Sequence, residues 1–132
     1  MIQEIDILEF IETKKELFLS LSNRVFETPE TLHGKYKLVS VHTNCPEEEG
    51  FGITKYLCDM PTAVLGEAGN EGPVNPFLGG FDALPGLSQQ PRKVQPIQVI
   101  KNVNGDNSGH NLLGVTSLPV ATAMRDWISF IK

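Results

Sequence analysis

Residues 83–109 form the longest stretch of this sequence that lacks both a sustained helical pattern and a regular strand pattern. Proline, glycine, glutamine, asparagine and aspartate dominate the stretch, and these residue types favour turns. Within it, only Val94–Val103 could pair briefly as a strand. Because a loop of this length in a compact domain usually carries function or is disordered, the residues at its two ends are candidates for function.

Apolar residues recur at helical spacing on both sides of this loop. Residues 2–27 predict one long helix or two short ones, with Ile5, Leu8, Ile11, Phe18, Leu21 and Val25 on one face. This helix should stop at Thr28, because the residue before a proline is pushed out of the helical region. Residues 111–131 predict a last helix, with Leu113, Val120, Met124, Trp127 and Ile131 along one face. Pro119 lies inside this pattern and should kink the helix.

The pattern over residues 30–45 is weaker and predicts a less stable helix. Tyr36, Val39 and Thr43 could share a face. Continuing the helix through Pro46 would cost about 3 kcal/mol, so it should end before that residue. Gly50 is a natural terminator for any helix that does continue.

Three short apolar stretches predict strands, over residues 51–58, 62–67 and 73–81. The third contains Pro76, which cannot donate to a sheet ladder, so it should be an edge strand or an irregular one. The order of elements predicts an α/β fold, with helices packed on a short mixed sheet. The 132 residues fit one domain with a modest core.

Charge and composition exclude some classes of partner. The net charge of −5 disfavours nucleic acid and anionic membranes, which reward basic patches. There is neither an apolar run of membrane-spanning length nor a basic secretory region at the N-terminus, so we expect a cytoplasmic protein. In that compartment Cys45 and Cys58 should be free thiols.

Asp82 follows the third apolar stretch and precedes a turn at Pro85-Gly86. Ligand and metal sites favour the carboxyl ends of strands in open α/β sheets, so Asp82 is a candidate site residue. Taken alone, the pattern favours another role, since aspartates commonly start turns by accepting hydrogen bonds from backbone amides.

His110 follows a glycine-rich stretch at the start of the last predicted helix. Neutral imidazole is the commonest metal ligand, but a single histidine does not make a metal site. On its own, His110 is better explained as an exposed residue of the first helical turn, with Ser108 or Asn111 as the cap.

Five short motifs in order change both interpretations. They are Pro29-Glu30, Glu49-Gly50-Phe51, Pro61-Thr62-Ala63, Phe81 to Gln90 (FDALPGLSQQ) and Ser108 to Gly114 (SGHNLLG). Together they resemble the start of the metallopeptidase and amidohydrolase family that includes aminoacylases, plant auxin-conjugate hydrolases and p-aminobenzoyl-glutamate hydrolases. The resemblance covers essentially the whole chain, and it implies that residues 1–132 are one partial catalytic domain, the N-terminal segment of a zinc-peptidase-like fold.

The resemblance also implies a metal site and a reaction. The family holds a dinuclear zinc or manganese centre that activates water to attack an amide carbonyl. His110 matches the ligand histidine, and Asp82 matches the aspartate that supports the centre. Ser108 lies where the family has its cysteine ligand, and a hydroxyl is a far poorer ligand than a thiolate. Asp106 lies where relatives often have histidine and is a weak candidate for an oxygen ligand.

The remaining residues of the family's site would follow Lys132. They are a Glu-Glu pair, which supplies the general base, and two histidines. We therefore expect a hydrolase of N-acyl amino acids by kinship, and no turnover by these 132 residues alone. The alternative is a non-catalytic remnant or interaction domain that self-associates as a homodimer or requires a complementing C-terminal part.

Other groupings of reactive residues are weaker. His33, His42, Cys45 and Cys58 lack the paired close spacing of a structural zinc site. Ser108 and His110 have no third residue to orient them as a nucleophile and base.

Overall fold

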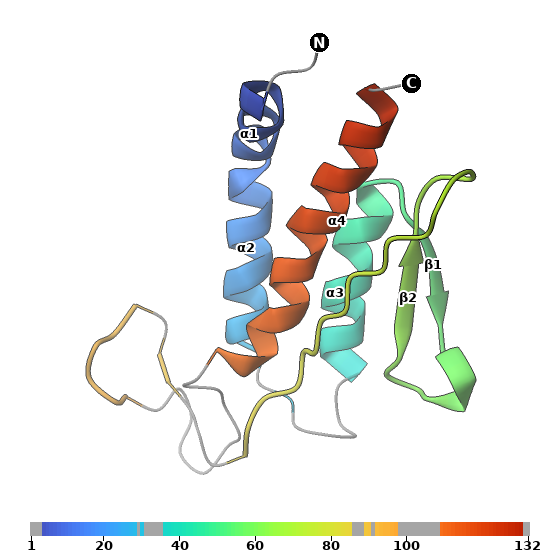
Figure 1. Cartoon of the computed structure of the whole chain (residues 1–132). Helices are drawn as coiled ribbons and strands as arrows, with labels where there is room; N and C mark the ends of the chain where they lie inside the picture. The colour runs from blue at the N-terminus through green and yellow to red at the C-terminus, as the bar shows by residue number, and fades with distance from the viewer. Residues whose placement is uncertain are drawn as a thin grey trace.

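A computed structural model of the chain describes residues 4–28, 30, 36–85, 89–90, 92–97 and 109–130. Three layers lie side by side in Figure 1: a column of two helices, a middle pair of helices, and a two-stranded hairpin. The α/β architecture predicted from the sequence is confirmed. No helix in the described ranges has the length and apolar character needed to cross a membrane.

The first predicted helix is divided into α1, Glu4–Thr13, and α2, Lys15–Phe26. Lys14 separates them, with φ −98° and ψ 3°. The two halves of the predicted apolar face differ, since Phe18, Leu21 and Val25 of α2 are buried while Leu8 of α1 is 65% exposed. As predicted, α2 ends just before Thr28.

Helix α3, Tyr36–Glu48, contains Pro46, so the prediction that it ends before this proline is wrong. Proline cannot donate the usual backbone hydrogen bond. The helix compensates by burying five side chains, namely Leu38, Val39, Thr43, Cys45 and Pro46. Tyr36, by contrast, is exposed.

Gly50 ends α3 as the sequence predicts. Its φ of +83° lies in the left-handed region. Its N–H donates to Glu47 O at 3.0 Å, and the N–H of Phe51 donates to Pro46 O at 2.9 Å. These two bonds make a Schellman motif, which turns the chain directly into the first strand.

Strands β1, Gly52–Lys55, and β2, Val64–Glu67, pair antiparallel, with Gly52 opposite Glu67 and Lys55 opposite Val64. They confirm the first two predicted strands, in shorter form. A short 3-10 turn, η1, Leu57–Asp59, joins them. The hairpin packs against α3, as Figure 1 shows.

The third predicted strand, residues 73–81, is wrong as a strand. The segment is extended but unpaired with β1 or β2. Figure 1 shows it descending beside the middle helices after the turn that follows β2. It bonds to a helix instead, as described below. No strand is found at residues 94–97, and the rest of the predicted Val94–Val103 strand lies outside the described residues.

The last helix is α4, Leu113–Phe130, preceded by the 3-10 turn η2, His110–Leu112. It is assigned without interruption across Pro119. Its predicted apolar face is not the buried one, because Leu113, Val120 and Trp127 are 45–50% exposed. Val115 and Thr122 are buried instead.

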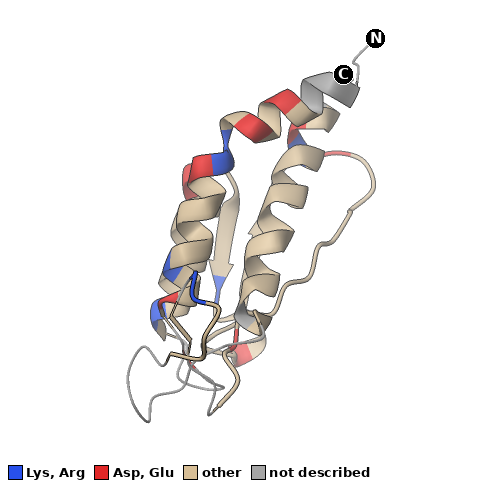
Figure 2. Cartoon of the chain, turned by 90° about the vertical axis from the view of Figure 1, so that its left-hand side faces the viewer, with Lys and Arg blue, Asp and Glu red and all other residues tan. Residues whose placement is uncertain are grey.

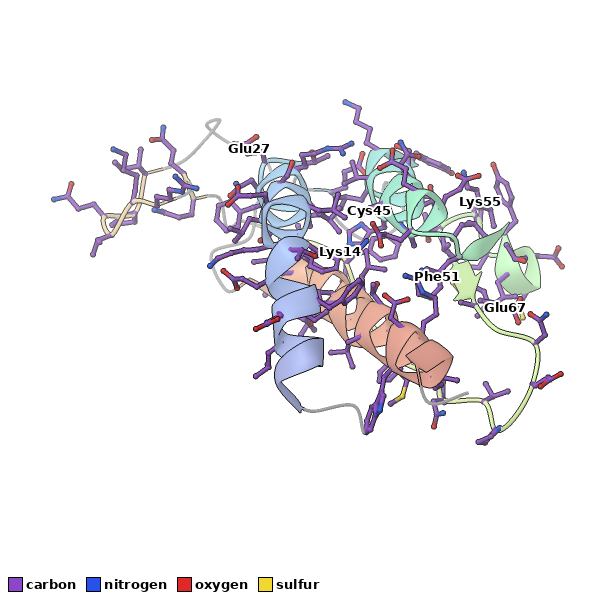
Figure 3. All side chains as sticks on the ribbon, turned by 90° about the horizontal axis from the view of Figure 1, so that it is seen from above. Lys14, Glu27, Cys45, Phe51, Lys55 and Glu67 are labelled. Carbon is purple, nitrogen blue, oxygen red and sulfur yellow. The ribbon has the colours of Figure 1, made fainter. Side chains whose placement is uncertain are left out.

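The core lies where α2, α3 and α4 meet. Its buried members are Leu21, Val25, Leu38, Cys45 and Val115, with Phe81 of the extended segment packed against them. Viewed from above in Figure 3, Cys45 lies among the helices, while Lys55 and Glu67 lie at the outer side with the hairpin. Cys45 is buried and Cys58 exposed, and both are free thiols.

A cluster of charges fastens one end of this core. We call Lys14, Glu49, Arg125 and Asp126 the Glu49 cluster. Lys14 Nζ bonds to the Glu49 carboxylate, Arg125 donates to the Glu49 backbone carbonyl, and Arg125 Nε lies 2.7 Å from Asp126 Oδ1. The cluster joins the α1–α2 junction, the end of α3 and the C-terminal half of α4.

Candidate functional site

The extended segment that carries Asp82 crosses the first turns of α4 at two glycines. A Cβ atom added to Gly79 would lie 2.6 Å from Gly114 Cα and 2.8 Å from Leu113 O. The backbones can approach this closely only because Gly79 has no side chain. The N–H of Gly114 donates to Gly80 O at 2.7 Å, and Ser117 Oγ lies 3.0 Å from Leu78 O. We call this contact between residues 78–80 and Gly114 and Ser117 the glycine crossing.

Glu30 fixes the segment on the other side of Asp82. Its backbone carbonyl accepts the N–H of Ala83 at 2.9 Å. Its carboxylate accepts the N–H of Leu38 at 2.9 Å and that of Lys37 at 3.4 Å. These amides belong to the first turn of α3 and have no partner within the helix. Glu30 therefore ties the Asp82 segment to the start of α3.

These anchors bring Asp82 beside His110, which are 28 residues apart in the chain. His110 Nδ1 lies 3.0 Å from the backbone O of Asp82 and 3.7 Å from its Oδ1. The Asp82 side chain is 19% exposed and that of His110 is 40% exposed. The structure therefore brings together two site residues that the sequence predicts.

The carbonyl oxygen of Asp82 defines the chemistry of this pair. A carbonyl can only accept a hydrogen bond, so His110 must donate from Nδ1 for the bond to form. In neutral imidazole, Nε2 then keeps its lone pair. Metal-binding histidines are commonly oriented in this way, with the second nitrogen donating to a carbonyl or carboxylate. The geometry fits His110 as a ligand through Nε2 and Asp82 as its support.

The other predicted ligands, Asp106 and Ser108, lie outside the described residues. Within the described part of the chain, no group of three or more histidine, cysteine, aspartate or glutamate side chains could hold a metal ion. The described residues thus supply one candidate ligand and its support. A complete dinuclear centre would need ligands from elsewhere.

Two residues that position the pair are not marked for this role by the sequence patterns. Glu30 belongs to one of the five motifs, but nothing in its spacing predicts that it caps a helix beginning six residues later. His42 enters the sequence patterns only as a poor candidate for a zinc site. Its spacing of four from Leu38 and three from Cys45 is a signal of a shared helix face. Both neighbours are buried, and burial lowers the pKa of His42 below its usual value.

Comparison with known proteins supports the resemblance drawn from the five motifs. No protein-family model matches the chain. One of the subunits of the p-aminobenzoyl-glutamate hydrolase of Escherichia coli (strain K12) is 32% identical over 118 residues. The match covers 89% of this chain and 24% of the relative, so the chain spans about a quarter of the length of the curated protein it matches.

Proposed function

The chain is homologous to the N-terminal portion of an amidohydrolase-family protein, and we propose that it carries part of a metal-dependent hydrolase site. The observation that supports this most is the Asp82–His110 pair, with Nδ1 of the histidine 3.0 Å from the aspartate backbone oxygen. The substrate class that we propose is the amide of an N-acyl amino acid. p-Aminobenzoyl-glutamate is the first candidate, from the name of the relative.

Each site residue has a separate role in this proposal. His110 binds zinc or manganese through Nε2, and Asp82 holds the imidazole in the required orientation. Asp106 is a weak candidate for an additional oxygen ligand, whereas Ser108, at the position of the family's cysteine, is not a ligand. The metal, when bound, supplies a Lewis acid that polarises the amide and activates water.

We further propose that these 132 residues do not turn over substrate alone. One histidine and one supporting aspartate do not hold two metal ions, and the described residues contain no larger ligand group. The pair would then serve catalysis only with ligands and a general base from other polypeptide.

Metal binding tests the site without requiring activity. Zinc is titrated into the apo-protein by calorimetry, and the His110→Ala variant should bind at least tenfold more weakly, as expected when a ligand is lost. His33→Ala is the matched control, because it removes an imidazole that lies outside the five motifs and should leave the affinity unchanged. Equal zinc affinity in His110→Ala and the wild type would contradict the proposed site.

An activity assay tests the second part of the proposal. The purified chain is incubated with zinc or manganese and p-aminobenzoyl-glutamate, and release of glutamate is followed. We expect none. Metal-dependent hydrolysis that is abolished in His110→Ala would overturn the proposal that the chain needs further residues, and would establish it as an enzyme by itself.

A second candidate function is self-association without catalysis. An apolar groove of about 320 Å³ lies between α1 and α4, lined by Ile11, Pro119, Val120, Ala123, Met124 and Trp127. Figure 2 shows that α4 carries no charge before its C-terminal part. Apolar patches of this kind mark interaction surfaces. Sedimentation of the wild type and of Trp127→Glu tests this candidate: a dimer that the variant dissociates supports it, and a wild-type monomer at high concentration rejects it.

A further inference from the structure

His42 lies in the middle of α3, where it faces both segments that form the Asp82–His110 pair. Its Nδ1 lies 3.0 Å from Leu38 O, one helical turn earlier. The carbonyl can only accept, so Nδ1 donates and the ring is held in one orientation. Nε2 is buried and has no hydrogen-bond partner among the described residues.

One face of the ring contacts the segment that carries Asp82. His42 stacks on Phe81 with ring centroids 4.7 Å apart and an angle of 27° between the planes. Phe81 is the residue immediately before Asp82 and packs against the buried core. The stack therefore restrains the backbone at the point from which Asp82 projects. Such ring pairs contribute about 0.5–1.5 kcal/mol beyond the area they bury.

The edge of the same ring contacts the helix start that carries His110. A Cβ atom added to Gly114 would lie 2.8 Å from His42 Nε2 and 3.0 Å from its Cδ2. The ring thus fills the space that a side chain at position 114 would occupy. Gly114 is four residues after His110 and donates its N–H to Gly80 O at 2.7 Å. His42, the Asp82 segment and the start of α4 consequently meet at one place.

We propose that His42 is a positioning residue for the Asp82–His110 pair, wedged between the segment that carries Asp82 and the helix start that carries His110. The inference rests on the proposed function for its consequence, which is a correctly oriented metal ligand. It does not touch the metal or the substrate. Its role is to keep Asp82 O within hydrogen-bond reach of His110 Nδ1, and so to keep the Nε2 lone pair of His110 available.

Two variants remove the stack from opposite sides. His42→Asn keeps an N–H donor near Leu38 O but loses the ring, and Phe81→Leu keeps an apolar side chain but removes the other ring. Val39→Ala is the control, because it removes a side chain from the buried face of the same helix, where Val39 is 8% exposed. It should lower stability without loosening the pair.

The tautomer of His110, read from the nitrogen resonances of its imidazole by NMR, is the measurement that a merely structural role would not move. In the wild type and in Val39→Ala we expect the Nδ1–H form. In His42→Asn and Phe81→Leu the ring should relax toward the tautomer mixture of free imidazole. Zinc affinity should fall about tenfold in the same two variants, the size of effect seen when an orienting partner is lost.

The inference is overturned if both variants keep the wild-type His110 resonances, or if Val39→Ala changes them equally. If His42→Asn does not fold, Phe81→Leu carries the test with the same expectation. A wild-type protein that binds no zinc would reject the proposed function, whereas the tautomer of His110 would still decide whether His42 positions it.

Discussion

The glycine crossing and the Glu49 cluster both join parts of the chain that are far apart in sequence, by opposite means. The cluster uses charged side chains, with Glu49 contacting Lys14 and Arg125. The crossing uses backbone atoms, with Gly79 against Gly114 and hydrogen bonds to Gly80 O and Leu78 O. Charged side chains can rearrange when one is changed, but two backbones in contact cannot. We therefore expect the crossing to tolerate substitution less than the cluster does.

The largest effect should follow Gly79→Ala. The new methyl group would collide with Gly114 Cα and Leu113 O, and backbone atoms cannot move aside as a flexible side chain can. We expect a loss of about 3 kcal/mol in the free energy of unfolding, at the upper end for overpacking. Urea denaturation measures it. Gly72→Ala, a glycine with no atom within 4 Å of the added Cβ but with φ +89°, is the control for backbone strain alone.

A loss of less than about 1 kcal/mol in Gly79→Ala, below the usual cost of overpacking, would contradict the idea that the crossing is rigid. The same variant should also disturb the Asp82–His110 pair, because residues 78–80 lead directly into Asp82. His110 resonances that remain unchanged in a folded Gly79→Ala protein would separate the stability of the crossing from its role in positioning the pair.

Glu49→Gln should have a smaller effect, of about 1–2 kcal/mol. The Glu49 side chain is 11% exposed, and Lys14 and Arg125 are each 24% exposed. The substitution leaves two cations near an uncharged amide, but solvent screens the partly exposed groups. Thermal unfolding at low and high salt checks this, and the difference should shrink at high salt. Glu12→Gln removes the partner of Lys15 in an exposed pair and should change the free energy of unfolding by less than about 0.5 kcal/mol.

The smallest predicted effect concerns pH and the His42 ring beside the crossing. Burial lowers the pKa of His42 in the folded chain, while the unfolded chain keeps an ordinary value near 6.5. Below that pH, the unfolded chain binds a proton that the folded chain excludes, so the free energy of unfolding falls as pH falls. The limiting slope is about 1.4 kcal/mol per pH unit. We expect wild type to lose about 1 kcal/mol more than His42→Asn between pH 7 and 5.5. Parallel curves for the two proteins would refute this account.

Local patterns predict the parts of the fold that depend on local chemistry. Gly50 is expected to end a helix and does so, because a Schellman motif needs a residue that adopts positive φ without cost. The end of α2 before Thr28 follows equally from the proline after it. The apolar faces are predicted less well, since Leu8 and Val120 fit a helical stripe and yet are exposed. Periodicity identifies a helix but does not say which stripe meets a neighbour.

Proline and strand patterns fail where packing outweighs them. Pro46 should stop α3, but the burial of Leu38, Val39, Thr43 and Cys45 carries the helix through it. Residues 73–81 alternate as a strand would, yet they bond to α4 and not to the hairpin. No pattern in that segment indicates which partner its backbone will find.

For the candidate site, the sequence by itself determined which residues could take part. Asp82 and His110 follow from motifs in order, since local turn and cap chemistry alone would have left them as a turn residue and a first-turn residue. Only the tertiary structure decided that they meet, through two glycines that let backbones touch, a glutamate that ties Ala83 to α3, and a histidine between the two segments. The physical reason is that residue type fixes what a side chain can bind, whereas contacts between segments many residues apart depend on how the whole chain packs.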